Sequence, residues 1–165
     1  MKVNARALVG ILLLELAFLP VYPVYLEAAM QSDSQAQVSA IVAKLANNEV
    51  GRIEILEMPP SLLTRTRITP EMLEAQFYYR LTIRDIRGGI YQSKLLAAAK
   101  SISVEPRNET SDLRWATIFY STEGVRLGAF YFDKTGSYGA VDSASVSFRG
   151  SFFKWLDGTF SSCFQ

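Results

Sequence analysis

Three strand-like runs in the last third of the chain constrain the fold more than any other feature of the sequence. They cover residues 114–121, 125–133 and 137–148, and each is rich in aromatic and β-branched side chains. The connections between them, 122–124 and 134–136, are short and each contains a glycine. Strand-like runs joined by such turns form antiparallel hairpins. The sequence therefore predicts a three-stranded antiparallel meander.

The middle of the chain adds helices to this sheet. An apolar face at helical spacing predicts a helix that ends near Ala46, and Thr69-Pro70-Glu71 is a helix start because threonine caps and proline fits the first helical position. Further helices are expected over 91–100, with Tyr91, Leu95 and Ala99 on its inner side, and from Ser151 to Gly158. Further strands are expected over 52–55 and 77–84, and 104–112 is expected to be a polar loop. The predicted fold is α+β, an antiparallel sheet of four to five strands packed against three to four helices.

The N-terminus has the order of an export signal. Lys2 and Arg6 precede an apolar run over 7–19, which is interrupted by Glu15, and small residues follow near Ala29. Residues 7–26 are also long enough to cross a bilayer, so an uncleaved signal-anchor is the main alternative to a cleaved signal peptide. A buried N-terminal helix in a cytosolic protein is the third reading.

These patterns predict three segments. Residues 1–29 are a signal peptide or signal-anchor, 30–36 are a polar linker, and 37–165 form a single globular domain. The domain is expected in the periplasm or secreted, or else anchored to a membrane only through its uncleaved N-terminal segment, because the basic residues stay on the cytoplasmic side.

Composition excludes several classes of function. The chain has no histidine and one cysteine, Cys163, which removes Ser–His and Cys–His nucleophiles and the usual metal sites. We expect no cofactor and no enzymatic activity. The formal net charge is +1, and this gives no support for a nucleic-acid partner, since such proteins carry a basic excess. The role of Cys163 stays open.

One tetrapeptide has a second interpretation. Asp133-Lys134-Thr135-Gly136 matches the start of the phosphorylation motif of P-type ion pumps. Those pumps are several times longer and carry many membrane spans, whereas here the four residues join two predicted strands. Asp and Gly at these positions are what a tight turn selects, so we assign a turn.

A basic set with tyrosine gives the best candidate for a binding surface. Arg80 and Arg84 share the solvent side of their predicted strand with Tyr78, Arg65 and Arg67 precede them, and Arg87 follows them. Arginine and tyrosine are enriched at protein interfaces. The alternative is a solvated face whose arginines pair with Glu71, Glu74 and Asp85. Tyr131 joins the candidates because both sides of 130–132 are aromatic, so that strand is either covered on both faces or lines a groove.

The leading functional hypothesis is an exported, non-enzymatic domain that binds another protein, of the inhibitor or immunity type or as part of an envelope assembly. The first alternative is a small-molecule carrier with a cleft between helix and sheet near Tyr131 and Trp155. The second is a hydrolase built on two carboxylates, which needs no histidine.

Overall fold

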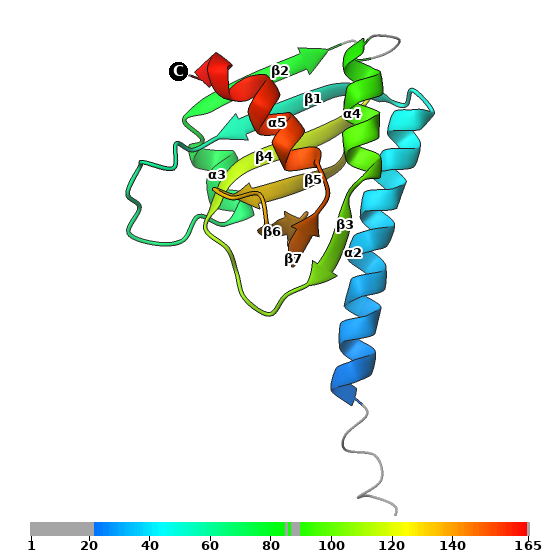
Figure 1. Ribbon diagram of the computed structural model, residues 1–165, viewed down its shortest axis with the longest axis vertical. Helices are drawn as coiled ribbons and strands as arrows, with labels where there is room; N and C mark the ends of the chain where they lie inside the picture. The colour runs from blue at the N-terminus through cyan, green and yellow to red at the C-terminus, as the bar shows by residue number, and fades with distance from the viewer. Residues whose placement is uncertain (1–21, 85, 87–89, 165) are drawn as a thin grey trace, which may run out of the picture.

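The computed structural model describes residues 22–84, 86 and 90–164 (Figure 1). The predicted export segment, 1–29, therefore lies outside the described residues as far as residue 21. Within the described residues, no helix has the length and apolar character needed to cross a membrane.

The described chain forms one seven-stranded sheet in which every pair of neighbouring strands is antiparallel. The strand order is β2-β1-β4-β5-β6-β7-β3, so β2 and β3 are the edge strands. The strands are β1 (Val50–Glu57), β2 (Tyr79–Arg84), β3 (Ser103–Pro106), β4 (Leu113–Ser121), β5 (Arg126–Asp133), β6 (Tyr138–Val141) and β7 (Ala144–Arg149). The helices are α2 (Tyr22–Ala46), α3 (Pro70–Gln76), α4 (Ile90–Lys100) and α5 (Phe152–Phe160), followed by a 3₁₀ turn (Ser161–Phe164).

Both faces of the sheet are covered, but unequally. Helices α2, α4 and α5 pack on one face, which we call the helical face, and Figure 1 shows α4 and α5 in front of the sheet. On the other face, the α3 face, the cover is α3 with the connection that precedes it, through Leu73, Ile68 and Met58. Because α3 contains only seven residues, it covers only part of that face.

The sheet has seven strands instead of the four to five predicted, and one segment expected as a loop contains a strand. The third predicted run, 137–148, is two strands, since Asp142 adopts a φ of 48° and a two-residue turn places Val141 opposite Ala144. Aspartate tolerates this left-handed conformation better than most residues, which is why an apparently continuous run can reverse there. The polar segment expected as a loop over 104–112 contributes β3, which is short and ends at Pro106.

The segment expected as a linker is helical instead. Helix α2 runs without a break through residues 30–36, and its N-terminal half projects beyond the sheet (Figure 1). The polar residues of this segment have structural contacts, because Ser34 is buried and Gln35 Oε1 accepts a hydrogen bond of 3.0 Å from the backbone N–H of Val104. The small polar residues that suggested a linker thus belong to a helix that is docked against the sheet.

The remaining helices follow their sequence signals with two exceptions. Thr69 caps α3, because its Oγ1 accepts from the N–H of Met72 at 3.3 Å, and Pro70 takes the first helical position as predicted. Tyr91, expected on the inner side of α4, is 58% exposed. Helix α5 continues past Gly158 to Phe160, whose buried ring extends the apolar face of this helix by one further residue.

A β-bulge near the start of β5 decides where one arginine points. Phe119 lies opposite Gly128 and Tyr120 lies opposite Arg126, so Leu127 is the extra residue. Leu127 packs with the helical-face core, and Arg126 consequently turns to the α3 face, although strict alternation from Phe130 would direct it to the helical face. Gly128 has a φ of 150°, and a Cβ there would lie 2.8 Å from Ile41 Cδ1 of α2, so a larger residue at this position would crowd the packing of α2 on β5.

We predict that Gln35→Ala lowers the free energy of unfolding by about 1 kcal/mol, since it leaves the Val104 N–H of the edge strand without its acceptor. Chemical denaturation measures this. The control is Ser39→Ala on the same helix, because Ser39 is exposed and bonds only within α2, to the carbonyl of Gln35. Equal effects of the two substitutions would contradict the docking of this helix through Gln35.

Candidate functional site

A row of arginines crosses four strands on the α3 face. In the register of the sheet, Arg84 of β2 lies opposite Arg52 of β1, and Arg52 lies opposite Tyr120 of β4. Tyr120 in turn lies opposite Arg126 of β5. We call these four residues the arginine row.

The centre of the row is a cation–π pair. The Arg52 guanidinium carbon lies 3.9 Å from the centroid of the Tyr120 ring, and its Nη1 lies 3.4 Å from Glu54 Oε1. The Arg52 Nε is buried and has no hydrogen-bond partner within the described chain. Burial, with the negative charge of Glu54 beside it, raises the pKa of Tyr120. The ring therefore stays neutral over the physiological range.

The outer end of the row carries a positive charge that no described residue pairs with. The Arg84 side chain is exposed and has no ion pair among the described residues, and its cross-strand neighbour is a second cation, Arg52. Like charges directly opposite each other in a sheet destabilise it. A hollow of about 340 Å³ opens beside the two arginines, and its lining is completed by Gly51 and by the hairpin residues 121–124, which include the acidic Glu123.

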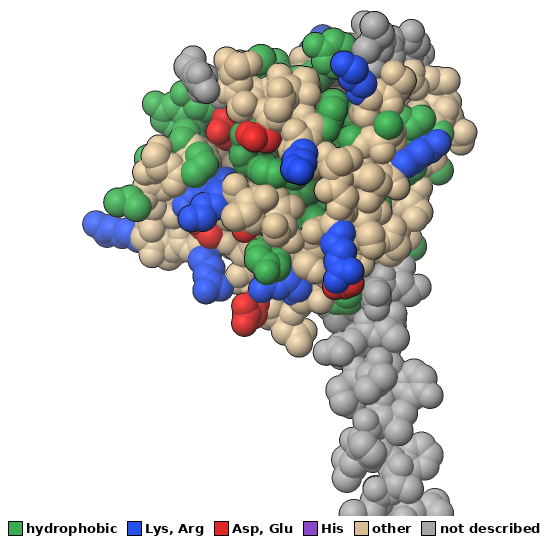
Figure 2. Space-filling view, viewed as in Figure 1, with side chains coloured by type: hydrophobic (Ala, Val, Ile, Leu, Met, Phe, Trp, Pro, Cys, Tyr) green, Lys and Arg blue, Asp and Glu red, His purple; other side chains and the backbone are tan. Residues whose placement is uncertain are grey.

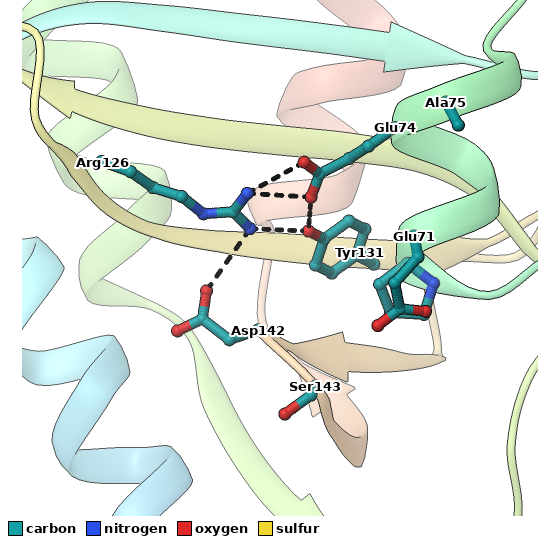
Figure 3. Close-up of a pocket in the computed structure, with 8 residues that line it drawn as sticks. Glu71, Glu74, Ala75, Arg126, Tyr131, Asp142 and Ser143 are labelled. Carbon is teal, nitrogen blue, oxygen red and sulfur yellow. Dashed lines mark hydrogen bonds and ion pairs between the residues drawn. The ribbon is translucent and has the colours of Figure 1, made fainter.

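The inner end of the row is a closed network (Figure 3). Arg126 Nη1 donates to both carboxylate oxygens of Glu74 at 2.9 and 3.0 Å, and its Nη2 donates to the Tyr131 hydroxyl at 2.8 Å. The Tyr131 hydroxyl donates to Glu74, and Asp142 Oδ1 lies 3.8 Å from Arg126 Nη2. Asp142 Oδ1 also accepts from the Ala129 N–H, which holds the β6–β7 turn against β5.

Two members of this network, Tyr131 and Arg126, have pKa values above their ordinary values. Burial, and then the hydrogen bond to Glu74, raises the pKa of Tyr131 far above its ordinary value. Burial alone would lower the pKa of Arg126, but the hydrogen bonds to Glu74 and Tyr131 outweigh it and raise the pKa. These side chains line a groove of about 610 Å³ beside α3. Because the four groups satisfy one another, they offer a ligand few free donors or acceptors.

The predicted surface residues are only partly brought together. Tyr78 is 64% exposed just before β2, and Arg80 and Arg84 lie on the α3 face of that strand. The Arg80 guanidinium carbon lies 4.4 Å from the centroid of the Phe77 ring, which packs against the α3-face core. These positions extend the arginine row along the edge of the sheet.

The other predicted members lie elsewhere. Arg65 is exposed in the connection between β1 and α3, and Arg67 donates to the Thr110 carbonyl at 2.9 Å and lines a separate hollow. The Tyr131 ring is only 1% exposed, because β5 is covered on both faces. Its hydroxyl nevertheless reaches the groove beside α3.

The expected acidic partners are engaged with other residues. Glu74 pairs with Arg126, and Glu71 accepts from the Thr69 hydroxyl at 2.8 Å. The third expected partner, Asp85, and the further basic residue Arg87 lie outside the described residues.

Sequence reasoning missed Arg52, Tyr120 and Arg126. Alternation places Arg52 and Glu54 on the side of β1 away from Ile53, a signal that was available. Arg126 had no such signal, because the bulge at Leu127 reverses its direction.

The opposite, helical face shows no comparable array. Figure 2 shows that face, where lysine and arginine side chains are dispersed among polar and apolar ones, with acidic side chains between them. The arginine row is therefore a local feature of the α3 face, hidden by the near-neutral net charge of the whole chain.

One carboxyl group on the helical face, that of Glu57, has a raised pKa. Glu57 is buried, its Oε2 has no hydrogen-bond partner within the described residues, and burial together with nearby Asp157 raises its pKa. Among the described residues, no group of three or more His, Cys, Asp or Glu side chains is arranged to hold a metal ion.

We predict that Tyr131→Phe lowers the free energy of unfolding by about 1–2 kcal/mol, because two charged partners lose their shared hydroxyl while the ring is kept. Chemical denaturation at neutral pH measures it. The matched control is Tyr120→Phe, which removes only a hydrogen bond of 3.4 Å to Glu54 and is expected to cost less than about 0.5 kcal/mol. Equal losses would show that the Tyr131 hydroxyl adds nothing specific to the network.

A second prediction concerns pH. The unfolded chain releases the Glu57 proton near its ordinary pKa of 4.5, whereas the folded protein holds that proton to higher pH. The contribution of Glu57 to stability therefore falls as pH rises from 4.5 through the folded pKa. Glu57→Gln is expected to gain stability relative to the natural protein over this window, measured by denaturation at successive pH values. Glu123→Gln in an exposed turn is the control, and parallel pH profiles for Glu57→Gln and the natural protein would contradict the prediction.

Comparison of the chain with known protein families, with curated proteins and with solved structures finds no match.

Proposed function

We propose that this protein is a non-enzymatic interaction domain of an extracytoplasmic compartment, and that it binds an acidic surface of another protein through the arginine row and Arg80. The observation that carries the proposal is the placement of Arg84 directly opposite Arg52 with no acidic partner for Arg84 in the described chain. The export signal predicted over 1–29 supports the compartment.

The arrangement of charge favours binding over stability. Arg52 already pairs with Glu54, whereas Arg84 has no ion-pair partner among the described residues, so a carboxylate beside Arg84 would offset the repulsion that it meets from Arg52. Arg126, by contrast, is already neutralised by Glu74. The free positive charge is thus concentrated at the β2 end of the row.

Guanidinium chemistry favours carboxylates as the recognised groups. Arginine presents donors in a planar fork that matches a carboxylate, and it keeps its charge at every physiological pH. The Tyr120 ring lies against the Arg52 guanidinium and fixes its plane. A nucleic acid would be expected to need a larger basic excess than this chain carries.

The small-molecule carrier is supported less well. Tyr131 and Trp155, which were expected to share a cleft, belong to the cores on opposite faces of the sheet. Half of the residues that line the groove beside α3 are charged, and three of them, Glu74, Arg126 and Asp142, already pair with one another, whereas carrier pockets are mostly apolar. A hydrolase would use Glu57 with Asp157, but burial is the main cause of the raised Glu57 pKa and a structural role accounts for it equally well.

The proposed function is tested by affinity capture of tagged full-length protein from its native host, with quantitative mass spectrometry. We expect a protein that is recovered with the natural chain and is reduced at least about tenfold by Arg84→Glu combined with Arg80→Glu. The control is Lys154→Glu, an exposed position of α5 on the helical face, which should leave recovery unchanged. The same sample gives the mature N-terminus and the cell fraction.

Two results would contradict the proposal. A set of captured proteins that is identical for the natural chain and the double variant would remove the arginines from the interaction. An intact chain confined to the cytosol would contradict the compartment.

A further inference from the structure

The two edges of the sheet are protected very differently. Edge strand β3 has four residues, ends at Pro106 and lies against α2, where Gln35 accepts its outward Val104 N–H. Such short, proline-ended and covered edges resist pairing with another chain. Edge strand β2 pairs with β1 on one side, and no strand of the described chain pairs with its other side.

Strand β2 has the regularity that strand addition needs. It pairs with β1 through six consecutive residues without a bulge and contains no proline. Its burial alternates strictly, so that Leu81 and Ile83 are half-buried while Arg80, Thr82 and Arg84 are exposed. The apolar side of this strand is therefore only partly covered by the helical-face core.

We propose that β2 is a docking edge to which a partner protein adds an extended acidic strand. The added strand would continue the sheet by main-chain hydrogen bonds, cover the half-buried apolar side of β2 with its own apolar residues, and place carboxylates beside Arg80 and Arg84. This inference rests on the proposed function and specifies its partner as an extended segment in which acidic and apolar residues alternate.

Residue spacing sets the pattern that fits. Arg80 and Arg84 are four residues apart on one side of the strand, and Leu81 and Ile83 are on the other. Since side chains alternate along a strand, a partner with acids four residues apart and apolar residues between them presents both faces correctly at once.

A second copy of the chain fits this edge poorly. Antiparallel pairing of two β2 strands centred on Thr82 would set each Arg80 opposite an Arg84 on the same face. Like charges in that position oppose association. The charge pattern thus favours an acidic partner over a homodimer.

A peptide tests strand addition directly. The probe is a peptide of about eight residues in which glutamate alternates with valine, labelled for fluorescence anisotropy and added to the full-length protein. We expect saturable binding that Arg80→Glu combined with Arg84→Glu weakens at least about tenfold, while Lys154→Glu leaves it unchanged. Amide hydrogen exchange should slow in β2 on binding and not in the covered edge β3.

The decisive control separates main-chain pairing from charge. Two versions of the peptide carry N-methyl groups at alternate residues, one version blocking each edge of the peptide strand. When the peptide lies antiparallel to β2 with its glutamates facing the arginines, only one of its edges can meet β2, so one version should bind like the parent and the other at least about tenfold more weakly. Equal binding of both versions would overturn antiparallel strand addition and leave the arginine-mediated proposal standing.

Three other results would also overturn strand addition. They are an absence of binding by the parent peptide, unchanged hydrogen exchange in β2 at saturation, and a dimer in analytical ultracentrifugation that Arg84→Glu or Arg80→Glu dissociates or strengthens. The last result would assign the edge to a second copy of this chain.

Discussion

Burial of strand β5 on both faces is the constraint on which the rest of this structure depends. Phe130 and Phe132 point into the helical-face core, and Tyr131 points the other way yet is equally buried. A buried phenol needs hydrogen-bond partners, because leaving it unsatisfied costs free energy. Glu74 on α3 and Arg126 on β5 supply them, so the shortest helix is held in place by the centre of the sheet.

The same constraint explains why part of the α3 face stays open. Helix α3 lies over the strands nearest Tyr131 and is too short to extend across β1 to β2. Polar and charged side chains therefore occupy the outer part of this face, where Thr82 lies opposite Glu54 and Arg84 opposite Arg52. A single bulge at Leu127 adds Arg126 to them and completes the row.

Most elements of the fold could be predicted, because their signals are local. The capped start of α3 and the alternation within β2 are visible in short stretches of sequence. The outer turns of α2 and the strand β3 were missed because their stability comes from distant partners, as the bond between Gln35 and Val104 shows. Their sequences are polar, and no local sequence pattern predicts a contact between residues so far apart along the chain.

The residues of the candidate site also divide into those that local sequence patterns predict and those that only the folded sheet brings together. Tyr78, Arg80 and Arg84 could be found from composition and period alone, whereas Arg65 and Arg67 were grouped with them only by sequence proximity. Arg52 and Tyr120 join the site through strand register, and register depends on the whole sheet. Tyr131 was a candidate for the right reason, an aromatic strand on both sides, but its ring is part of the core.

The two edge strands of the sheet, β2 and β3, differ in how their charges and backbone groups are satisfied. Arg52 pairs with Glu54, and Arg126 pairs with Glu74, whereas Arg84 has no ion-pair partner among the described residues. Arg84 lies on an edge strand that pairs with no strand of the described chain other than β1, while at the other edge α2 satisfies the Val104 N–H. Positive charge without an ion-pair partner and a strand edge without a further strand in the described chain each favour association with another chain. Both features lie on β2, and this coincidence, in a chain whose net charge is near neutral, is the reason for proposing an acidic strand rather than a polyanion as the partner.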